Sequence, residues 1–235
     1  FMEQFVTIRT DLGKPNRFWT NVYEGIGRAN DALARIDLAT EADYPQKIER
    51  EAELRFLRGH WYFLLKILFK NPVWIDETVA KEEIKNIPNL VYTSDEFWDK
   101  IAEDFEFAAN NLPLLQDEVG RASQTAAWAY LAKVRLYQAY EQNDKHEVVN
   151  INEDRLQQVI TLTDYVINSG KHSLSPDFAD NFLVETKNGP ESIFAIQFSV
   201  DDGTPTGRIF KAAGLNYNMA PEYGCCDFHN PSQNM

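Results

Sequence analysis

Hydrophobic residues in the first two thirds of the chain recur at every third or fourth position, which predicts a series of amphipathic helices. The clearest case is the stretch 54–69, where apolar residues form two rows on different sides of one helix. The first row is Leu54, Leu57, Trp61, Leu64 and Leu68, and the second is Phe56, Phe63 and Ile67. We expect both rows to be buried and this helix to have neighbours on two sides. It must end before Pro72, because proline disfavours helical backbone in the residue before it.

The same spacing predicts four further helices, at residues 16–37, 93–112, 122–141 and 154–169. Asn16 is positioned to cap the first of these, and Thr93 with Glu96 has the sequence of a capping box. Gly170 is expected just after the last helix, where left-handed backbone favours glycine. Residues 192–198 alternate between apolar and polar side chains, which predicts a short strand.

Two of the predicted helical hairpins follow one plan. The motif Phe-Trp-x-x-Val that starts at Phe18 recurs as Phe-Trp-x-x-Ile at Phe97, and in the partner helices residues 56–57 match 130–131. A repeated helical hairpin indicates stacked, solenoid-like packing. We therefore predict a mostly all-α fold, with a tetratricopeptide-like helical layer in residues 1–170 and an irregular, loop-rich segment containing the short strand in residues 171–235. Long insertions in such a layer gather on one face and form its binding surface.

Charge and composition exclude several classes of partner. The net charge is −13 and the pI is about 4.8. Nucleic acid binding requires clustered Lys and Arg, and a membrane-surface helix requires a basic face, so we expect neither. No run of about 18 apolar residues is present, so the sequence predicts no membrane-spanning helix. The adjacent Cys225 and Cys226 would form a disulfide only with strain, so we interpret them as ordinary thiols and infer no compartment from them.

The sequence carries none of the motifs that mark an active site. The four histidines lack metal-site spacing, and there is no nucleophile elbow, phosphate loop or dinucleotide fingerprint. Glycoside hydrolysis needs two carboxylates at a defined separation, and we interpret the alternating glutamates of residues 49–53 as a solvated face at a helix start. We therefore predict a protein that is not an enzyme and that holds no metal and no cofactor.

Two polar residues are expected in buried positions. Asn30 lies on the apolar face of the first predicted helix, where its side chain would tie down a loop. Arg58 lies between the two apolar rows of the second helix. A buried guanidinium needs a partner, for which we expect Asp104 or a glutamate. Both residues are interpreted as structural rather than as ligand contacts.

Several stretches of the chain resemble motifs of the SusD/RagB family. Residues 53–59, Glu-Leu-Arg-Phe-Leu-Arg-Gly, followed by two aromatic residues and a proline-containing turn, are similar to the family's long helix. Gly59 takes the place of the usual alanine, Lys70 that of the turn glycine, and Pro72 falls one position early. The other stretches that resemble family motifs are residues 19–30, 104–137, 190–194 and 231–235. Together they cover most of the chain.

The resemblance implies a non-catalytic lipoprotein on the outer-membrane surface of Bacteroidetes-type bacteria, which binds an oligosaccharide or polysaccharide. It also implies delivery of this glycan to a SusC-like TonB-dependent transporter. On this interpretation the chain is a fragment, without the lipidated N-terminus that anchors the family and without the C-terminal half. The alternative is a tetratricopeptide-like scaffold for protein–protein interaction, which would bind through polar residues of its concave helices. A glycosidase is a third class.

Carbohydrate rings stack on exposed aromatic side chains, so aromatic residues in loops are the candidate ligand contacts. These are Trp74, Tyr92, Phe210, Tyr217, Tyr223 and Phe228. Trp74 is the strongest candidate for ligand contact, because the turn at Pro72 would hold its ring on a rigid element. Tyr217 and Tyr223 are expected next, because the surrounding Asn- and Gly-rich chain offers backbone donors and amide groups. For each of them, ordinary packing is the alternative.

Overall fold

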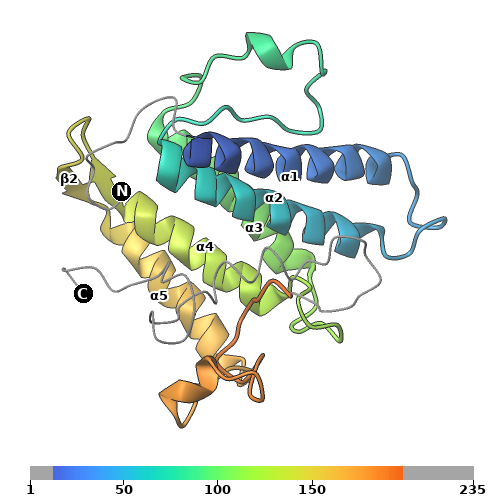
Figure 1. Cartoon of the computed structure of the whole chain (residues 1–235), viewed down its shortest axis with the longest axis vertical. Coiled ribbons are helices and arrows are strands. Elements are labelled where there is room, and N and C mark those ends of the chain that lie inside the picture. Colours follow the sequence, from blue (N-terminus) through green and yellow to red (C-terminus); the bar gives the residue numbers. More distant parts are fainter. Residues whose placement is uncertain (1–12, 198–235) are drawn as a thin grey trace, which may run out of the picture. The chain divides into compact units, whose positions relative to one another are not determined.

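The structure is a computed structural model, and it describes residues 13–197 (Figure 1). The helices are α1 (Gly13–Asp37), α2 (Lys47–Phe69), α3 (Ser94–Asn111), α4 (Gln124–Ala139) and α5 (Glu153–Asn168), with two 3-10 turns, η1 (Ile84–Asn86) and η2 (Phe178–Asn181). Two strands, β1 (Tyr140–Gln142) and β2 (Val148–Ile151), form a hairpin between α4 and α5. Within the described range, no helix combines the length and the hydrophobicity that a membrane span requires.

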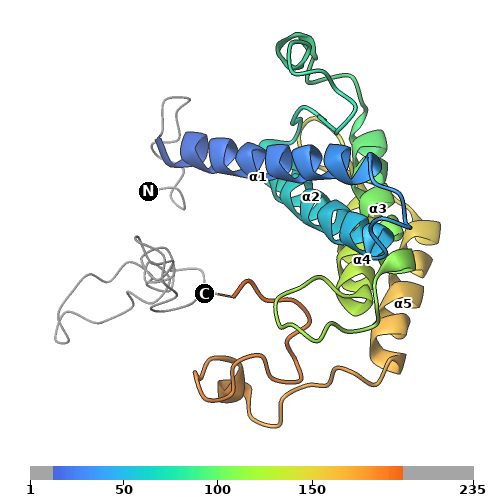
Figure 2. The ribbon, with the colours of Figure 1, turned by 90° about the vertical axis from the view of Figure 1, so that its right-hand side faces the viewer.

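The five helices form a stacked layer in which each helix packs against the next one along the chain. α2 lies between α1 and α3 and also touches α4, so its predicted inner position is confirmed. The connection between α2 and α3 projects from one end of the layer, and the segment after α5 projects from the other (Figure 2). This arrangement confirms the mostly all-α fold of stacked helical hairpins.

Aromatic side chains from α2, α3 and α4 fill the centre of the layer. Phe56, Tyr62 and Phe105 are fully buried, and Tyr130 stacks on Phe105 with ring centroids 5.2 Å apart. The close approach of α2 and α3 depends on Gly59, because a Cβ at this position would lie 3.1 Å from the Phe105 ring. Buried rings of this size remove large apolar areas from water, so this cluster is a main source of stability for the layer.

The two apolar rows predicted for α2 are only partly buried. Leu57 is 37% exposed, Ile67 40% and Leu68 60%, so the expectation that both rows are covered is wrong for these residues. The fully buried side of α2 is centred on Phe56 and Tyr62 instead. The physical reason is that α1 and α3 cover two sides of the helix, and these three residues lie on the side that neither of them covers.

Most of the predicted helix-end signals are confirmed. The Thr93 hydroxyl accepts a hydrogen bond from the Glu96 amide at 3.2 Å, and the Glu96 carboxylate accepts one from the Thr93 amide at 2.7 Å, which completes the capping box. Gly170 follows α5 with a φ of +64°. Asn16 is not the cap of α1, because the helix already begins at Gly13. Pro15 allows the earlier start, since a proline in the first turn sacrifices no helical hydrogen bond.

The predicted strand at residues 192–198 is not formed in its described part, residues 192–197. The Ser192 amide donates to the Gly189 carbonyl in a turn, and the Phe194 ring packs edge-on against Phe56 with centroids 4.9 Å apart. Among residues 13–197 no strand pairs with this stretch, and its apolar residues Ile193 and Phe194 pack against the helical core instead.

A hairpin replaces the predicted end of the fourth helix. α4 ends at Ala139 rather than near residue 141, and Tyr140 of β1 then pairs with Ile151 of β2. The Asn152 amide donates to the Ala139 carbonyl at 2.8 Å and closes the hairpin onto the helix. β-Branched residues dominate β2 and favour extended backbone. The residues of β1 continue the predicted fourth helix, so the sequence pattern did not distinguish this strand from the helix.

The contacts divide the chain into two compact units, Phe1–Phe194 and Ala195–Met235. The predicted boundary after residue 170 differs from this division, because the segment that follows α5 is attached to the helices. The His172 Nε2 and Thr125 Oγ1 atoms lie 2.9 Å apart, and Phe194 joins the aromatic core.

Candidate functional site

The extended stretch of residues 72–77, called the pinned segment below, is held by hydrogen bonds from side chains of two helices, α1 and α2. The Tyr23 hydroxyl donates to the Val73 carbonyl and accepts from the Val73 amide, both at 2.8 Å. The Tyr62 hydroxyl does the same for Ile75, at 2.9 and 2.7 Å. The two tyrosine hydroxyls thus form the hydrogen bonds that a neighbouring β-strand would otherwise make with these backbone N–H and C=O groups. The result is a single extended stretch fixed on a helical layer.

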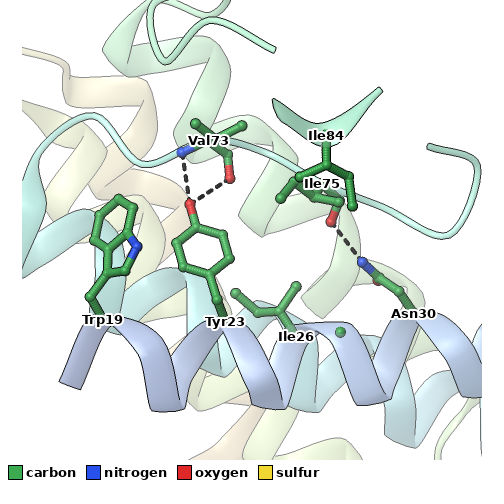
Figure 3. Close-up of a pocket in the computed structure, with 8 residues that line it drawn as sticks. Trp19, Tyr23, Ile26, Asn30, Val73, Ile75 and Ile84 are labelled. Carbon is green, nitrogen blue, oxygen red and sulfur yellow. Dashed lines mark hydrogen bonds between the residues drawn. The ribbon is translucent and has the colours of Figure 1, made fainter. Parts of the chain in front are cut away.

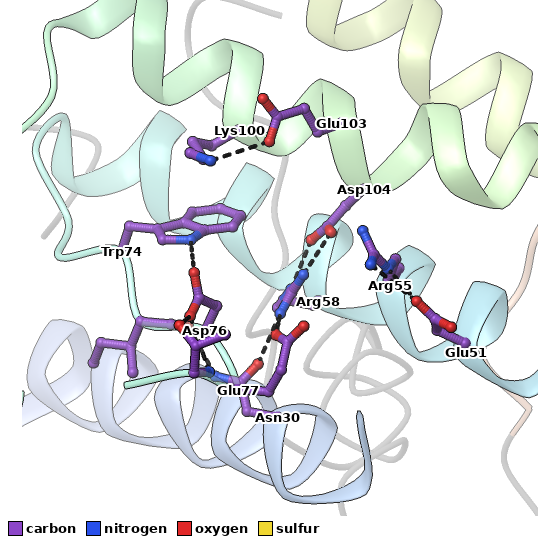
Figure 4. Close-up of polar contacts among 12 residues, drawn as sticks. Asn30, Glu51, Arg55, Arg58, Trp74, Asp76, Glu77, Lys100, Glu103 and Asp104 are labelled. Atoms are coloured by element: carbon purple, nitrogen blue, oxygen red, sulfur yellow. Dashed lines mark hydrogen bonds and ion pairs between the residues drawn. The ribbon is translucent and has the colours of Figure 1, made fainter. Parts of the chain in front are cut away.

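Arg58 connects the pinned segment to α1 and α3 (Figure 4). The residue is 3% exposed, and its Nε and Nη2 donate to the two carboxylate oxygens of Asp104 at 2.8 and 2.7 Å. Its Nη1 donates to Asn30 Oδ1 at 3.1 Å and also pairs with Glu77. Asn30 in turn donates from Nδ2 to the Ile75 carbonyl at 2.8 Å. The predicted structural roles of Asn30 and Arg58 are therefore confirmed.

The electrostatics of this cluster keep Arg58 charged. Burial by itself lowers the pKa of Arg58, but the hydrogen bonds and charge of Asp104, with the charge of Glu77, reverse this effect and raise the pKa above its ordinary value. The guanidinium uses its donors on Asp104, Asn30 and Glu77. Arg58 therefore has a structural role, and its guanidinium presents no free pair of N–H donors to a ligand.

Trp74 lies in the core, contrary to the expectation of an exposed ring. Its side chain is 7% exposed and stacks on Tyr62, with ring centroids 4.2 Å apart and an interplanar angle of 22°. Phe97 meets the indole edge-on at 5.7 Å, and the indole Nε1 donates to Asp76 at 3.2 Å. The turn does hold the ring rigidly, but it directs the ring inwards, so Trp74 presents no face on which a sugar could stack.

A cavity of about 360 Å³ lies between α1 and the pinned segment (Figure 3). Its walls are Trp19, Tyr23, Ile26, Gly27, Asn30, Val73, Ile75 and Ile84. The polar atoms of Tyr23 and Asn30 are already engaged with the backbone of Val73 and Ile75, as the dashed lines in Figure 3 show. The cavity is therefore lined by apolar surface and supplies few partners for sugar hydroxyls.

The remaining candidate aromatic residues fall into two groups, and Phe210 and Phe228 belong to the second, because they lie outside the described residues. Tyr92 is half-buried and packs against the core, and Tyr217 and Tyr223 lie outside the described residues, as do Cys225 and Cys226. Sequence reasoning overlooked Phe178 and Phe182, which are 77% and 73% exposed. The signal that could have found them is two phenylalanines four positions apart in a loop, among acidic residues.

Taken together, these features define a class of protein. Among residues 13–197, no group of three or more His, Cys, Asp or Glu side chains is arranged to hold a metal ion. The buried charged groups around the pinned segment are paired with one another. Stacked helical layers of this kind present extended surfaces that repeat proteins use for binding.

Comparison with known proteins specifies the family. The SusD-like family described as "Starch-binding associating with outer membrane" matches residues 2–136, more than half of the chain. The chain belongs to this family, as its motifs indicated. SusD-like protein P2 of Formosa agariphila is 26% identical over 227 residues, which cover 93% of this chain and 41% of P2. The chain therefore spans about two fifths of the length of this relative.

Solved structures show the same fold. A SusD-like carbohydrate-binding protein of Bacteroides fragilis aligns with a TM-score of 0.68 at 24% identity, over 82% of this chain and 35% of the other. A laminarin-binding SusD-like protein aligns with a TM-score of 0.60 at 25% identity, over 75% of this chain and 36% of the other. Both likenesses confirm the helical layer as the SusD-like helical fold.

Proposed function

We propose that this protein is a non-catalytic glycan-binding component of the outer-membrane surface. The observation that carries the proposal is the family match over residues 2–136, which includes α1 to α3 and the pinned segment. The similar structure named as laminarin-binding supports a polysaccharide as the ligand.

The proposal includes a partner and a location. The protein would be tethered to the outer membrane by a lipid and would pass its glycan to a SusC-like TonB-dependent transporter. The family description, which names association with the outer membrane, supports this placement. Co-purification of a transporter with the lipid-anchored protein tests the partnership, and uptake of labelled oligosaccharide in its presence and absence tests delivery.

Within the proposal, Tyr217 and Tyr223 remain the loop aromatics that we assign to ligand contact. Trp74 has a different role, because its buried indole stabilises the pinned segment from behind. Loss of one stacking ring should weaken glycan binding about five- to thirtyfold, as expected for 1–2 kcal/mol. Tyr217→Ala and Tyr223→Ala are therefore compared with the unchanged chain in glycan titrations.

Affinity electrophoresis tests the function itself. The chain is run through native gels that contain laminarin, starch, xyloglucan or an anionic polysaccharide such as pectin, with bovine serum albumin as a non-binding control. Retardation by at least one glycan, without release of sugar, is the expected result. If no glycan slows the chain relative to albumin, the glycan-binding proposal is wrong, and sugar release would make the protein a glycosidase.

The second candidate is a protein-interaction scaffold, and the open side of α2 favours it. Leu57 and Leu68 are exposed on a helix of a tetratricopeptide-like layer, which is a surface that a partner helix could cover. Replacing both with Gln should leave glycan retardation unchanged if the first proposal is right. A protein partner whose binding these substitutions abolish, with no glycan bound by the unchanged chain, would favour the scaffold instead.

A further inference from the structure

The residue that follows α2 has a backbone conformation that residues with a side chain rarely adopt. Lys70 has a φ of +60° and a ψ of −58°, and the Asn71 amide donates to the Phe69 carbonyl across it at 2.6 Å. These values describe a γ-turn of the rare form with positive φ, which is strained in any residue that carries a Cβ. The strain lies directly before the pinned segment, which begins at Pro72.

A buried lysine closes this turn. Lys66 is 6% exposed, and its Nζ donates to the Lys70 carbonyl at 2.8 Å, while the Lys70 amide donates to the Lys66 carbonyl at 3.1 Å. The ammonium also lies 5.4 Å from the centre of the Phe97 ring and 5.9 Å from that of the Trp98 ring. Aromatic faces at these distances attract a cation. Two hydrogen bonds and two rings of α3 therefore hold the turn closed.

The Lys66 ammonium is buried without a carboxylate partner in the described part of the chain, unlike the guanidinium of Arg58, which pairs with Asp104. From α3 it meets two uncharged rings. From its own turn it meets the charge of Lys70, which pairs with Asp144 of the β1–β2 connection at 3.7 Å. Burial, and to a smaller extent the Lys70 charge, lower the pKa of Lys66 from 10.5 to about 8. The protonated side chain is therefore less favourable in the closed turn than in water.

We propose that residues 66–72 form a two-state hinge, called the Lys70 hinge below, in which Lys66 moves into water and Lys70 relaxes in one step. The positive φ and the buried charge oppose the closed state, whereas the two hydrogen bonds and the ring contacts favour it. Because these opposing contributions are of similar size, the hinge opens locally while the helices stay folded. This inference does not depend on the glycan-binding function proposed above.

Opening of the Lys70 hinge acts on the pinned segment and on the cavity beside it. Pro72 connects the turn to Val73, whose amide and carbonyl are both bound by the Tyr23 hydroxyl. Val73 is also part of the wall of the cavity between α1 and the pinned segment. The hinge therefore sets the position of one wall of this cavity.

Protons favour the open state of the hinge. In the open state Lys66 has its ordinary pKa of 10.5, whereas in the closed state its pKa is about 8. Between these two values the open state binds more protons, so a rise in pH favours the closed state. From pH 7 to pH 9 the open population should fall about tenfold.

Amide hydrogen exchange measures the open population. The Asn71 and Val73 amides report the hinge, and the Phe105 amide inside α3 reports global unfolding. After correction for the intrinsic exchange rate at each pH, the two hinge amides should exchange at least about tenfold faster than Phe105 at pH 7 and should slow about tenfold by pH 9. If the hinge amides are as protected as Phe105, no separate hinge exists and the proposal is wrong.

Lys70→Gly tests the strain. Glycine adopts positive φ freely, so exchange at Asn71 and Val73 should slow at least about fivefold at pH 7, with the dependence on pH retained. Asn188→Gly is the matched control, because Asn188 also has a positive φ, of +59°, but lies in the segment after α5. It should leave exchange at the hinge unchanged. Equal exchange in Lys70→Gly and the unchanged chain would overturn the proposal.

Lys66→Met tests the charge and distinguishes a hinge from a turn that Lys66 only caps. Methionine keeps an apolar contact with the two rings and carries no charge, so exchange at the hinge should slow at pH 7 and no longer change between pH 7 and pH 9. Lys145→Met removes an exposed lysine and should keep the dependence on pH. Faster exchange in Lys66→Met, or an unchanged dependence on pH, would show that Lys66 is a stabilising cap and that the hinge assignment is wrong.

Discussion

At the scale of single residues, the surroundings of each ionisable side chain in the core determine whether that side chain is charged. Arg58 stays charged because Asp104 and Glu77 surround it, whereas His60 is held neutral. Burial, with a smaller contribution from the Lys133 charge, lowers the pKa of His60 from 6.5 to about 4. Both effects follow from the cost of removing a charge from water, which only a close partner of opposite sign offsets.

The Arg58–Asp104 pair is expected to be essential for folding. Asp104→Asn keeps the shape of the side chain but leaves a buried guanidinium without its main counter-charge, so the free energy of unfolding should fall by about 3 kcal/mol. Urea denaturation followed by circular dichroism measures this loss. Glu103→Gln is the matched control on the same helix, because Glu103 makes an exposed pair with Lys100 and should change stability by less than about 0.5 kcal/mol. Similar losses in both variants would contradict the structural role of the buried pair.

Trp74→Ala should reduce stability and leave glycan binding intact. The indole fills a buried position between Tyr62 and Phe97, so its removal leaves a cavity and should cost about 3–5 kcal/mol. Thermal melts and glycan titrations on the same preparation check both parts, at a temperature where the variant is still folded. A large loss of affinity with an unchanged melt would show that the indole contacts the ligand after all.

The lowered pKa of His60 predicts that the folded chain loses stability in mild acid. Its folded pKa of about 4 lies below the ordinary 6.5, so between these values the unfolded chain binds more protons than the folded chain. The stability contributed by neutral His60 is therefore complete above pH 6.5 and is lost as the pH falls towards 4. His60→Gln keeps a polar group near Tyr130 without titrating there. The wild-type chain should lose up to about 3 kcal/mol more than this variant on acidification, as measured by denaturation at several pH values. Parallel pH profiles would contradict this assignment.

At the scale of elements, close helix packing and the pinned segment determine how the layer is assembled. Tyr23 from α1 and Tyr62 from α2 each bind both backbone groups of one residue, so the segment is extended without belonging to a sheet. α2 can reach α3 closely because Gly59 has no side chain beneath the Phe105 ring. The family's usual alanine at this position would need the ring to move.

Gly59→Ala is accordingly expected to destabilise the layer. The added methyl would lie 3.1–3.3 Å from three atoms of the Phe105 ring, which is fully buried, so overpacking should cost about 1–3 kcal/mol. In Gly27→Ala nothing lies within 4 Å of the new methyl. This control should gain about 0.5–1 kcal/mol because alanine favours the helix. Chemical denaturation of both variants gives the comparison, and a gain in Gly59→Ala would show that the α2–α3 contact is looser than described.

At the scale of the whole molecule, the described helices share one continuous aromatic core and should unfold together. Rings from α2, α3 and α4 contact one another across both hairpins. Circular dichroism reports all five helices, whereas tryptophan fluorescence reports five positions, of which Trp19, Trp61 and Trp74 belong to the first hairpin region. The two signals should show the same midpoint on urea unfolding. Two separated transitions would mean that the hairpins fold independently, as in longer repeat arrays.

The sequence by itself determined the helices, their order and several of their ends. Helical periodicity and capping are local properties, so Thr93, Glu96 and Gly170 could be assigned without knowing their neighbours. The partner of Arg58 was also predictable, because a buried cation requires an acid and Asp104 lies on the apolar side of the next helix. The family motif of residues 53–59 added the class of protein, which periodicity alone does not specify.

Only the tertiary structure decided which side of each element faces water. Leu57 and Leu68 continue an apolar row but are exposed, because burial depends on whether a neighbouring helix covers that side. Trp74 follows a turn but is buried, because Tyr62 and Phe97 from two other helices enclose it. Phe178 and Phe182 are exposed although they are apolar, on a loop whose two arms are joined by hydrogen bonds to the Glu191 carboxylate. Periodicity identifies apolar faces, but the packing partners that bury or expose them come from distant parts of the chain.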